Sequence, residues 1–178
     1  MRGFSLAYGN MRRPMLRSLP MKELLIVWHS QFGGTAQMAA AAREGASGVP
    51  DVTLTYVEAN LAGVAEFQRC DGLLLATSEN FGSLSGMSKD FLERVFYPCE
   101  HAMAGKPYSV IVCAGSDGEG TMRQTDRIIT GLRMRKVLPG VVYRSGITAQ
   151  PVQVPTAALA QCRELGATLA AGMAAGIW

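Results

Sequence analysis

Histidine is scarce in this chain. Its 178 residues include only two histidines, His29 and His101, which lie far apart. A zinc site usually needs several histidine or cysteine ligands at short spacing, and a Ser-His-Asp triad needs a histidine for its serine. Neither pattern is present. The sequence therefore predicts no metal site and no hydrolytic triad, and we assign no catalytic residue.

Cysteine is also sparse and widely spaced. The four cysteines form no C-x-x-C pair and no ligand-like spacing with histidine; they are Cys70, Cys99, Cys113 and Cys162. Because 48% of the residues are hydrophobic, a chain of this size builds a core without needing disulfides. We interpret the cysteines as reduced, mostly buried thiols, and this interpretation predicts a cytoplasmic location.

Long apolar runs and an excess of one charge are lacking too. No apolar run reaches the roughly 18–20 residues that span a bilayer, and Leu165–Trp178 is short and interrupted by glycine. Four of the 17 basic residues lie within residues 1–20, which leaves 13 basic and 14 acidic residues in the rest. This nearly neutral body lacks a basic surface for nucleic acid. The sequence thus predicts neither a membrane nor a nucleic-acid partner.

Residues 1–20 differ in composition from the rest of the chain. They contain four arginines and no acidic residue, and they lack the continuous apolar segment of a secretory signal. We interpret them as a disordered N-terminal extension. An upstream start codon before Met21 or a mobile tail explains them better than an organelle transit peptide. Residues 21–178 contain no linker, repeat or shift in composition, so we expect them to form one domain.

Beyond Met21, apolar strand patterns alternate with helical patterns. The expected strands are Glu23–His29, Val52–Glu58, Leu73–Thr77, Pro107–Gly115 and Gly140–Ile147. The expected helices cover residues 35–45, 64–69, 85–98 and 121–134, with Pro98 ending the third and a last helix starting at Pro155. Strands that are apolar along their whole length are typical of parallel sheets buried on both faces. The pattern predicts an α/β fold with five parallel strands and helices on both faces.

Three loops after the expected strands are the candidate ligand site. They read SQFGGTAQ, TSENFGSLSG and AGSDGEGT, and ligands of such sheets bind beyond the carboxyl ends of the strands. The first loop offers two hydroxyls and two glycine amides at the start of a helix, where an anion is stabilised. It contains no lysine and neither the G-x-x-x-x-G-K-[ST] nor the G-x-G-x-x-G pattern. Two interpretations stay open: a site for one phosphomonoester, or an ordinary capped turn.

The same stretches resemble the flavodoxin-like flavoproteins, in particular the NAD(P)H:quinone and FMN reductases of the WrbA type. Ser30–Ala39 has the S-x-x-G-x-T-x-x-M-A form of their FMN phosphate loop. Phe81–Arg94, FGSLSGMSKDFLER, is similar to their F-G-x-M-[SA]-G-x-[ML]-K-x-F-L-D-R signature. The resemblance runs from Met21 to about Ala149. It implies a flavodoxin-like, doubly wound five-stranded parallel sheet of order 2-1-3-4-5, with FMN as the cofactor.

The resemblance also implies which residues contact FMN. The implied phosphate contacts are Ser30, Gln31, Phe32, Gly33, Gly34 and Thr35. Those along one side of the isoalloxazine are Thr77, Ser78, Glu79, Asn80, Phe81 and Gly82. Those at its pyrimidine edge are Ala114, Gly115, Ser116, Asp117 and Gly118.

One departure from the family pattern concerns the second of these loops. Where the family commonly has G-[ST]-P-[TVI]-[YR], this chain has Ala76–Asn80, which places Glu79 near the expected ring. We expect Glu79 to be an exposed carboxylate at the rim and Asp117 to cap its own turn. We expect the backbone N–H groups of the third loop to stabilise the reduced flavin.

The resemblance implies an oxidoreductase that takes hydride from NAD(P)H through FMN and reduces a quinone or another small acceptor. Two alternatives stay open: a flavodoxin-type one-electron carrier with protein partners, and a flavin-free binding module on the same fold. Carriers usually present an acidic docking face, and this chain has no acidic run. Small residues in the last helix permit a homodimer or homotetramer without requiring one; they are Gly166, Ala170, Gly172 and Ala174.

Overall fold

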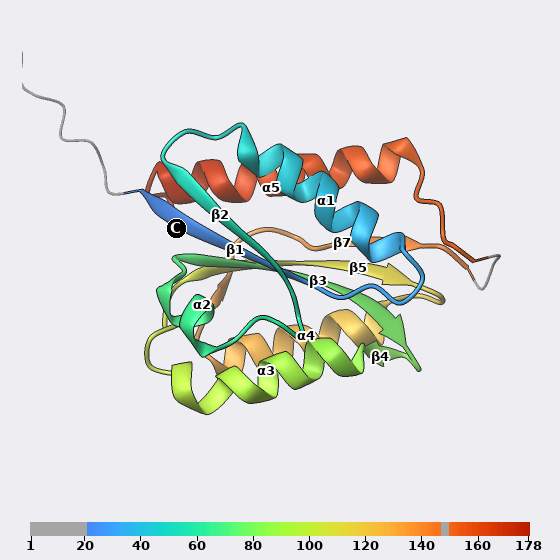
Figure 1. Ribbon diagram of the computed structural model, residues 1–178, viewed down its shortest axis with the longest axis horizontal. Coiled ribbons are helices and arrows are strands. Elements are labelled where there is room, and N and C mark those ends of the chain that lie inside the picture. Colours follow the sequence, from blue (N-terminus) through green and yellow to red (C-terminus); the bar gives the residue numbers. More distant parts are fainter. Residues whose placement is uncertain (1–20, 147–149) are drawn as a thin grey trace, which may run out of the picture.

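A computed structural model describes residues 21–146 and 150–178 (Figure 1). The long strands are β1 (Lys22–Trp28), β2 (Val52–Glu58), β3 (Gly72–Asn80), β5 (Pro107–Ala114) and β7 (Val141–Arg144), and the two short ones are β4 (Ser83–Leu84) and β6 (Arg135–Lys136). The helices are α1 (Gly34–Ser47), α2 (Val64–Arg69), α3 (Gly86–Cys99), α4 (Glu119–Gly131) and α5 (Thr156–Ala174). The expected N-terminal extension and Ile147, the end of the fifth expected strand, lie outside the described residues.

The long strands form one parallel sheet in the order β2-β1-β3-β5-β7. This order confirms the predicted 2-1-3-4-5 arrangement. Two strands share the edge of the sheet beside β5: β6 pairs with the start of β5, and β7 pairs with its end. The register aligns Leu25 of β1 with Leu73 of β3, and Leu75 of β3 with Val110 of β5. The carboxyl ends of β1, β3, β5 and β7 therefore meet at one edge.

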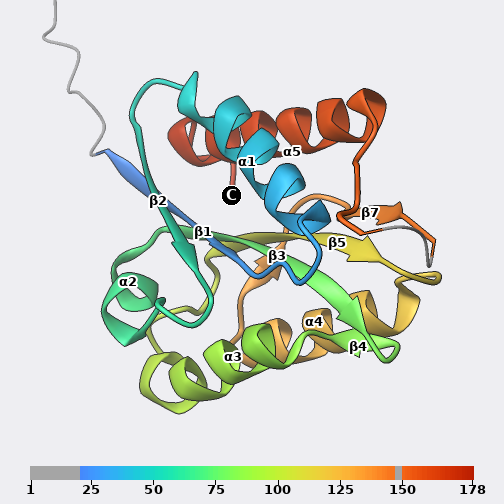
Figure 2. The same cartoon turned by 45° about the vertical axis from the view of Figure 1, so that its right-hand side comes forward.

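Helices cover both faces of the sheet, as predicted (Figures 1 and 2). Helices α1 and α5 pack on one face, and α2, α3 and α4 pack on the other. Alternate residues of β1 serve the two layers: Leu24 and Ile26 join the α1/α5 core, whereas Leu25 and Val27 join the opposite core. Because both faces are buried, β1 needs apolar side chains on both. No helix in the described ranges has the length and apolar character to cross a membrane.

Several element ends differ from the predictions, for example β7, which ends at Arg144, and three of these differences have a clear structural reason. Helix α4 ends at Gly131 rather than at residue 134, since Arg133 adopts a left-handed φ of 60° that a continuing helix does not allow. Pro98 lies inside the last turn of α3 instead of ending it, where its missing N–H costs only one hydrogen bond. Strand β3 runs on to Asn80 and turns back into β4 as a short hairpin. The second candidate loop is therefore largely strand.

Helices α1 and α5 cross at very short range through glycine. A Cβ at Gly45 would overlap the carbonyl oxygen of Arg163, and one at Gly166 would overlap that of Ala42. Likewise, a Cβ at Gly172 would overlap the ring of Trp178. These small residues of the last helix thus serve packing within the chain, so their size does not argue for a subunit contact.

Candidate functional site

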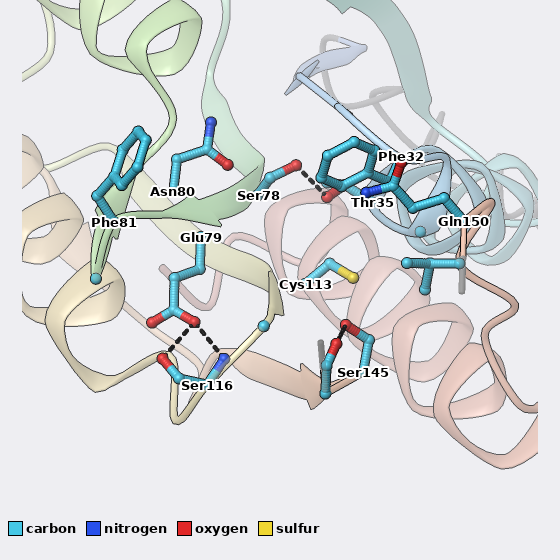
Figure 3. A pocket seen from close by; sticks show the side chains of 15 residues that line it. Phe32, Thr35, Ser78, Glu79, Asn80, Phe81, Cys113, Ser116, Ser145 and Gln150 are labelled. Carbon is cyan, nitrogen blue, oxygen red and sulfur yellow. Dashed lines mark hydrogen bonds between the residues drawn. The ribbon is translucent and has the colours of Figure 1, made fainter. Parts of the chain in front are cut away.

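A pocket of about 340 Å³ opens at the carboxyl edge of the sheet (Figure 3). Its walls come from the β1–α1 loop, the β3–β4 hairpin, the loop after β5 and the loop after β7. The lining residues are Phe32, Gly34, Thr35, Ser78, Glu79, Asn80, Phe81, Gly82, Cys113, Gly115, Ser116, Ser145, Gly146, Gln150 and Val152. The three loops singled out in the sequence are thus brought together, with a fourth segment added.

The start of α1 forms one wall of the pocket. Gly33 takes a left-handed φ of 83° immediately before the helix, which glycine adopts without strain. At Gly34, a Cβ would lie 2.6 Å from Cys113 Sγ and 2.9 Å from a methyl carbon of Val152. No side chain within the described ranges caps α1, and its first turn has no acidic residue. Since Gly34 and Thr35 line the pocket, the amides at this helix start are presented to it.

Ser78 connects β3 to the first loop. Its Oγ lies 3.0 Å from Thr35 Oγ1, accepts from the backbone N–H of Gln31 at 3.4 Å and donates to the His29 carbonyl at 3.3 Å (Figure 3). Ser30 Oγ, by contrast, is buried without a hydrogen-bond partner among the described residues. A buried hydroxyl without a hydrogen-bond partner is unfavourable unless a ligand or water supplies that partner. The first loop therefore contains one unsatisfied buried hydroxyl, on a residue that does not itself line the pocket.

Glu79 joins the end of β3 to the third loop at the edge of the pocket. Its Oε2 accepts hydrogen bonds from Ser116 N at 2.7 Å and Ser116 Oγ at 2.8 Å, and its Oε1 accepts from Gly118 N at 3.2 Å (Figure 3). Glu79 is thus a half-buried carboxylate that lines the pocket, and its pairing with the third loop was not predicted. The residue lies 37 positions from Ser116, and the match between its carboxylate and two loop amides arises only when both loops meet. Two amides expected to face the flavin are already paired with Glu79.

The seventeen predicted contact residues divide into two groups. Ten line the pocket: Phe32, Gly34, Thr35, Ser78, Glu79, Asn80, Phe81, Gly82, Gly115 and Ser116. Seven do not: Ser30, Gln31, Gly33, Thr77, Ala114, Asp117 and Gly118. Among these, the Thr77 hydroxyl is buried on the α3 side against Ser85. Asp117 Oδ1 accepts from Glu119 N at 2.7 Å, which confirms that Asp117 caps its own turn.

Sequence reasoning missed the fourth segment. Ser145, Gly146, Gln150 and Val152 come from the connection between β7 and α5, and Cys113 precedes the third loop by one residue. A signal was available, because the loops after all strands of a parallel sheet reach the same edge. The last of these loops carries no recognisable motif, so its part in the pocket had no local sign in the sequence.

The electrostatics of the pocket are simple. Within the described part of the chain, Glu79 is the only lining residue with a charged side chain, and no lysine or arginine lines the pocket. Burial lowers the pKa of nearby His29, although Glu58 partly offsets this effect. Burial raises the pKa of the Cys113 thiol, with hydrogen bonds to Ser145 and Thr35 opposing it. Both groups are therefore neutral at pH 7, and an anion at α1 meets neutral donors.

Comparisons with known proteins point in one direction. Residues 36–149 match the family described as NADPH-dependent FMN reductase. The chain is 28% identical over 121 residues to an NAD(P)H dehydrogenase (quinone) of Acidithiobacillus ferrooxidans (strain ATCC 53993 / BNL-5-31), spanning 56% of this chain and 60% of that protein. It is 27% identical over 146 residues to NAD(P)H dehydrogenase (quinone) 3 of Rhizobium meliloti (strain 1021), spanning 69% and 68%. A solved WrbA-like flavodoxin protein from Agrobacterium tumefaciens shares the fold, with a TM-score of 0.70, 20% identity and coverage of 87% and 98%.

The fold and the pocket together define the class of protein. It is an α/β protein with the flavodoxin-like fold, and its candidate ligand pocket opens at the carboxyl edge of the sheet. The chain belongs to the NADPH-dependent FMN reductase family, whose match covers more than half of its residues. This membership confirms the resemblance to a flavodoxin-like, FMN-binding family found in the sequence. The chain spans 60% and 68% of the lengths of the two relatives named above.

Proposed function

We propose that this protein binds FMN in the pocket, takes hydride from NAD(P)H and reduces a quinone or another small acceptor. One observation carries the proposal: the start of α1 opens into the pocket. Among the described residues no side chain caps this helix start, and the pocket is lined by neutral donors and by no basic residue. A phosphomonoester at a helix start needs only such donors. Two relatives are named NAD(P)H dehydrogenase (quinone), and this name favours a quinone as the acceptor.

The FMN phosphate fits the first loop by its chemistry. Ser30 provides a buried hydroxyl that no described residue satisfies, and Thr35 provides a second hydroxyl that already contacts Ser78. At position 34 a Cβ would collide with Cys113 and Val152, so glycine is required there, and Gly34 lines the pocket. These groups would hold the phosphate, while the third loop and the β3–β4 hairpin would hold the ring.

The protein and the cofactor would contribute differently to the reaction. When bound, FMN supplies the hydride chemistry, and the chain supplies position and electrostatics. Phe32 and Phe81 are exposed at the pocket rim, where they would provide flat apolar surfaces for a planar acceptor. Phe81 is also held at a left-handed φ of 54°, a strained conformation for a non-glycine residue. This cost favours a role for Phe81 at the site.

We also propose the cytoplasm as the location of this protein. The structure shows Cys70, Cys99, Cys113 and Cys162 free and buried. Burial raises the pKa of Cys70 and of Cys162 to about 12, so these thiols are protonated and unreactive at neutral pH. Such thiols suit a reducing compartment, where disulfides are rare.

Absorption spectroscopy with added FMN tests the proposal directly. We expect a 1:1 complex whose flavin absorbance bleaches within seconds in anaerobic NADPH and recovers when a quinone is added. A complex that ignores NADPH and NADH but accepts electrons from a separate reductase would instead favour the one-electron carrier. A protein that binds no FMN would rule out both functions.

A double variant tests the phosphate site, Ser30→Ala with Thr35→Ala. The variant removes two donors to a charged group, so we expect FMN affinity to fall by about 10- to 100-fold. The matched control is Ser47→Ala with Thr53→Ala, which removes two exposed hydroxyls bonded to the Glu44 and Lys22 carbonyls. The control should bind FMN as the wild type does. Equal affinity in the two double variants would contradict the assignment.

A further inference from the structure

The Glu79 carboxylate occupies the hydrogen-bond donors of the third loop. Both of its oxygens are engaged, through Ser116 N, Ser116 Oγ and Gly118 N. Glu79 and Ser116 also line the pocket, and Figure 3 shows their contact at its edge. The pocket thus contains a negative charge where the fold alone would leave uncharged N–H donors.

The carboxylate is held from both sides. Its strand continues into a hairpin in which Glu79 pairs with Leu84, and the turn residues Phe81 and Gly82 have φ values of 54° and 68°. A Cβ at Gly120 of α4 would overlap the Gly82 carbonyl oxygen, so the turn packs directly onto the helix. A hydrogen bond from the Ser83 hydroxyl to the Gln124 side chain secures the same contact. Glu79 is therefore a fixed charge.

The surroundings of Glu79 do little to neutralise it. The third loop also contains the acidic residues Asp117 and Glu119, and Arg144 donates to the Asp117 carbonyl with its Nε. Within the described chain no lysine or arginine lines the pocket. The two amide dipoles stabilise the carboxylate, but its net charge remains beside any ligand held between the hairpin and the third loop.

We propose that Glu79 sets the reduction potential of the bound flavin and lowers it. This inference rests on the proposed function, that is, on FMN lying in this pocket. Hydride transfer to a flavin adds two electrons and one proton, so the ring gains one negative charge unless a second proton follows from solvent. A fixed carboxylate nearby disfavours that added charge, and it also removes two amides that would stabilise it.

The expected consequence is that the reduced flavin is a stronger reductant in this site. Reduced FMN should bind more weakly than oxidised FMN, because only the reduced ring carries the added charge. The low potential then increases the driving force for transfer of both electrons, with the hydride proton and one solvent proton, to a quinone that becomes a quinol. Glu79 acts here through its charge and is not a catalytic residue.

The test compares the affinity for FMN in its two redox states. For the wild type, we expect a larger Kd for reduced than for oxidised FMN. For Glu79→Gln, we expect the Kd of oxidised FMN to stay within about threefold and that of reduced FMN to fall at least tenfold, which for a two-electron couple is a rise in midpoint potential of about 30 mV. Glu93→Gln removes an exposed carboxylate paired with Lys89 and should change neither value.

Three results would overturn the inference. One is a wild type that binds reduced FMN more tightly than oxidised FMN, a measurement that needs no variant. Another is a Glu79→Gln protein whose two Kd values change by the same factor, since loosening of the loop alone affects both redox states. The third is a wild type that binds no FMN, which rejects the proposed function as well and is thereby distinguished from the first two.

Discussion

The side chain of Gln37 in α1 lies against the backbone of Val152, with its Nε2 donating to the Val152 carbonyl at 2.7 Å. The same Nε2 also donates to the Gly33 carbonyl at 3.1 Å, and Oε1 accepts from Val154 N at 3.2 Å. A backbone bond from Val152 N to the Phe32 carbonyl at 2.9 Å is the third link between the two segments. One glutamine thus fixes the segment after β7 onto the start of α1, where it forms a wall of the pocket.

Replacement of this glutamine should loosen that wall. For Gln37→Leu, we expect a loss of about 1–3 kcal/mol in the free energy of unfolding, because two backbone groups lose their partner, and faster FMN dissociation. Urea unfolding and stopped-flow measurements give the two quantities. Gln68→Leu is the control, because Gln68 is exposed and its side-chain amide donates to the Pro98 carbonyl at the surface; this change should alter stability by about 0.5 kcal/mol or less. Similar losses in the two variants would refute this role of Gln37.

The stability of the protein should decline in acid partly through His29. Burial lowers its pKa below 6.5, so the unfolded chain takes up the proton more readily than the folded one. The stability contributed by neutral His29 is therefore present above about pH 6.5 and is lost as pH falls through the lower folded pKa. Between pH 7.5 and 5, we expect the free energy of unfolding to fall less steeply in His29→Gln than in the wild type. Parallel curves in urea titrations would show that His29 contributes nothing.

The α1–α5 crossing should not tolerate a methyl group. In a helix, Gly→Ala normally stabilises by up to about 1 kcal/mol. At Gly45, however, the new Cβ would overlap the Arg163 carbonyl of α5, and we expect Gly45→Ala to cost about 1–3 kcal/mol or more. Gly86 begins α3 with open space around its Cβ position, so Gly86→Ala should be neutral or stabilising. Thermal unfolding compares the two; a Gly45→Ala protein as stable as the wild type would mean that the helices move apart freely.

Much of the fold could be predicted from local patterns. The runs in β1 and β5 are apolar on both faces, which only a covered sheet accommodates, and the predicted bounds of β2 and α2 match the structure. The two short strands could not be predicted, because β4 and β6 have two residues each and show no periodicity. The end of α4 was missed since the left-handed Arg133 carries no glycine signal.

The candidate site was predictable to a smaller extent. The loops after β1, β3 and β5 were identified because their position follows from the topology, and each contributes to the pocket. Side-chain direction was less accessible. Thr77 and Ser78 are neighbours in the second loop, yet Ser78 turns to Thr35 and Thr77 turns to Ser85, since successive side chains of a strand point to opposite faces.

Hydrophobic alternation and helix-start signals were enough to predict the strands, the helices and a sheet covered on both faces, because each depends on residues close together in the chain. The order of the strands and a phosphate loop after β1 were implied only by the resemblance of two motifs to a known family. Tertiary structure alone decided that Glu79 pairs with Ser116 and Gly118, and that Gln37 holds Val152. Those contacts join segments tens of residues apart, and their geometry depends on how the loops meet. The periodic patterns of a sequence do not indicate which distant backbone amide a carboxylate will accept a hydrogen bond from.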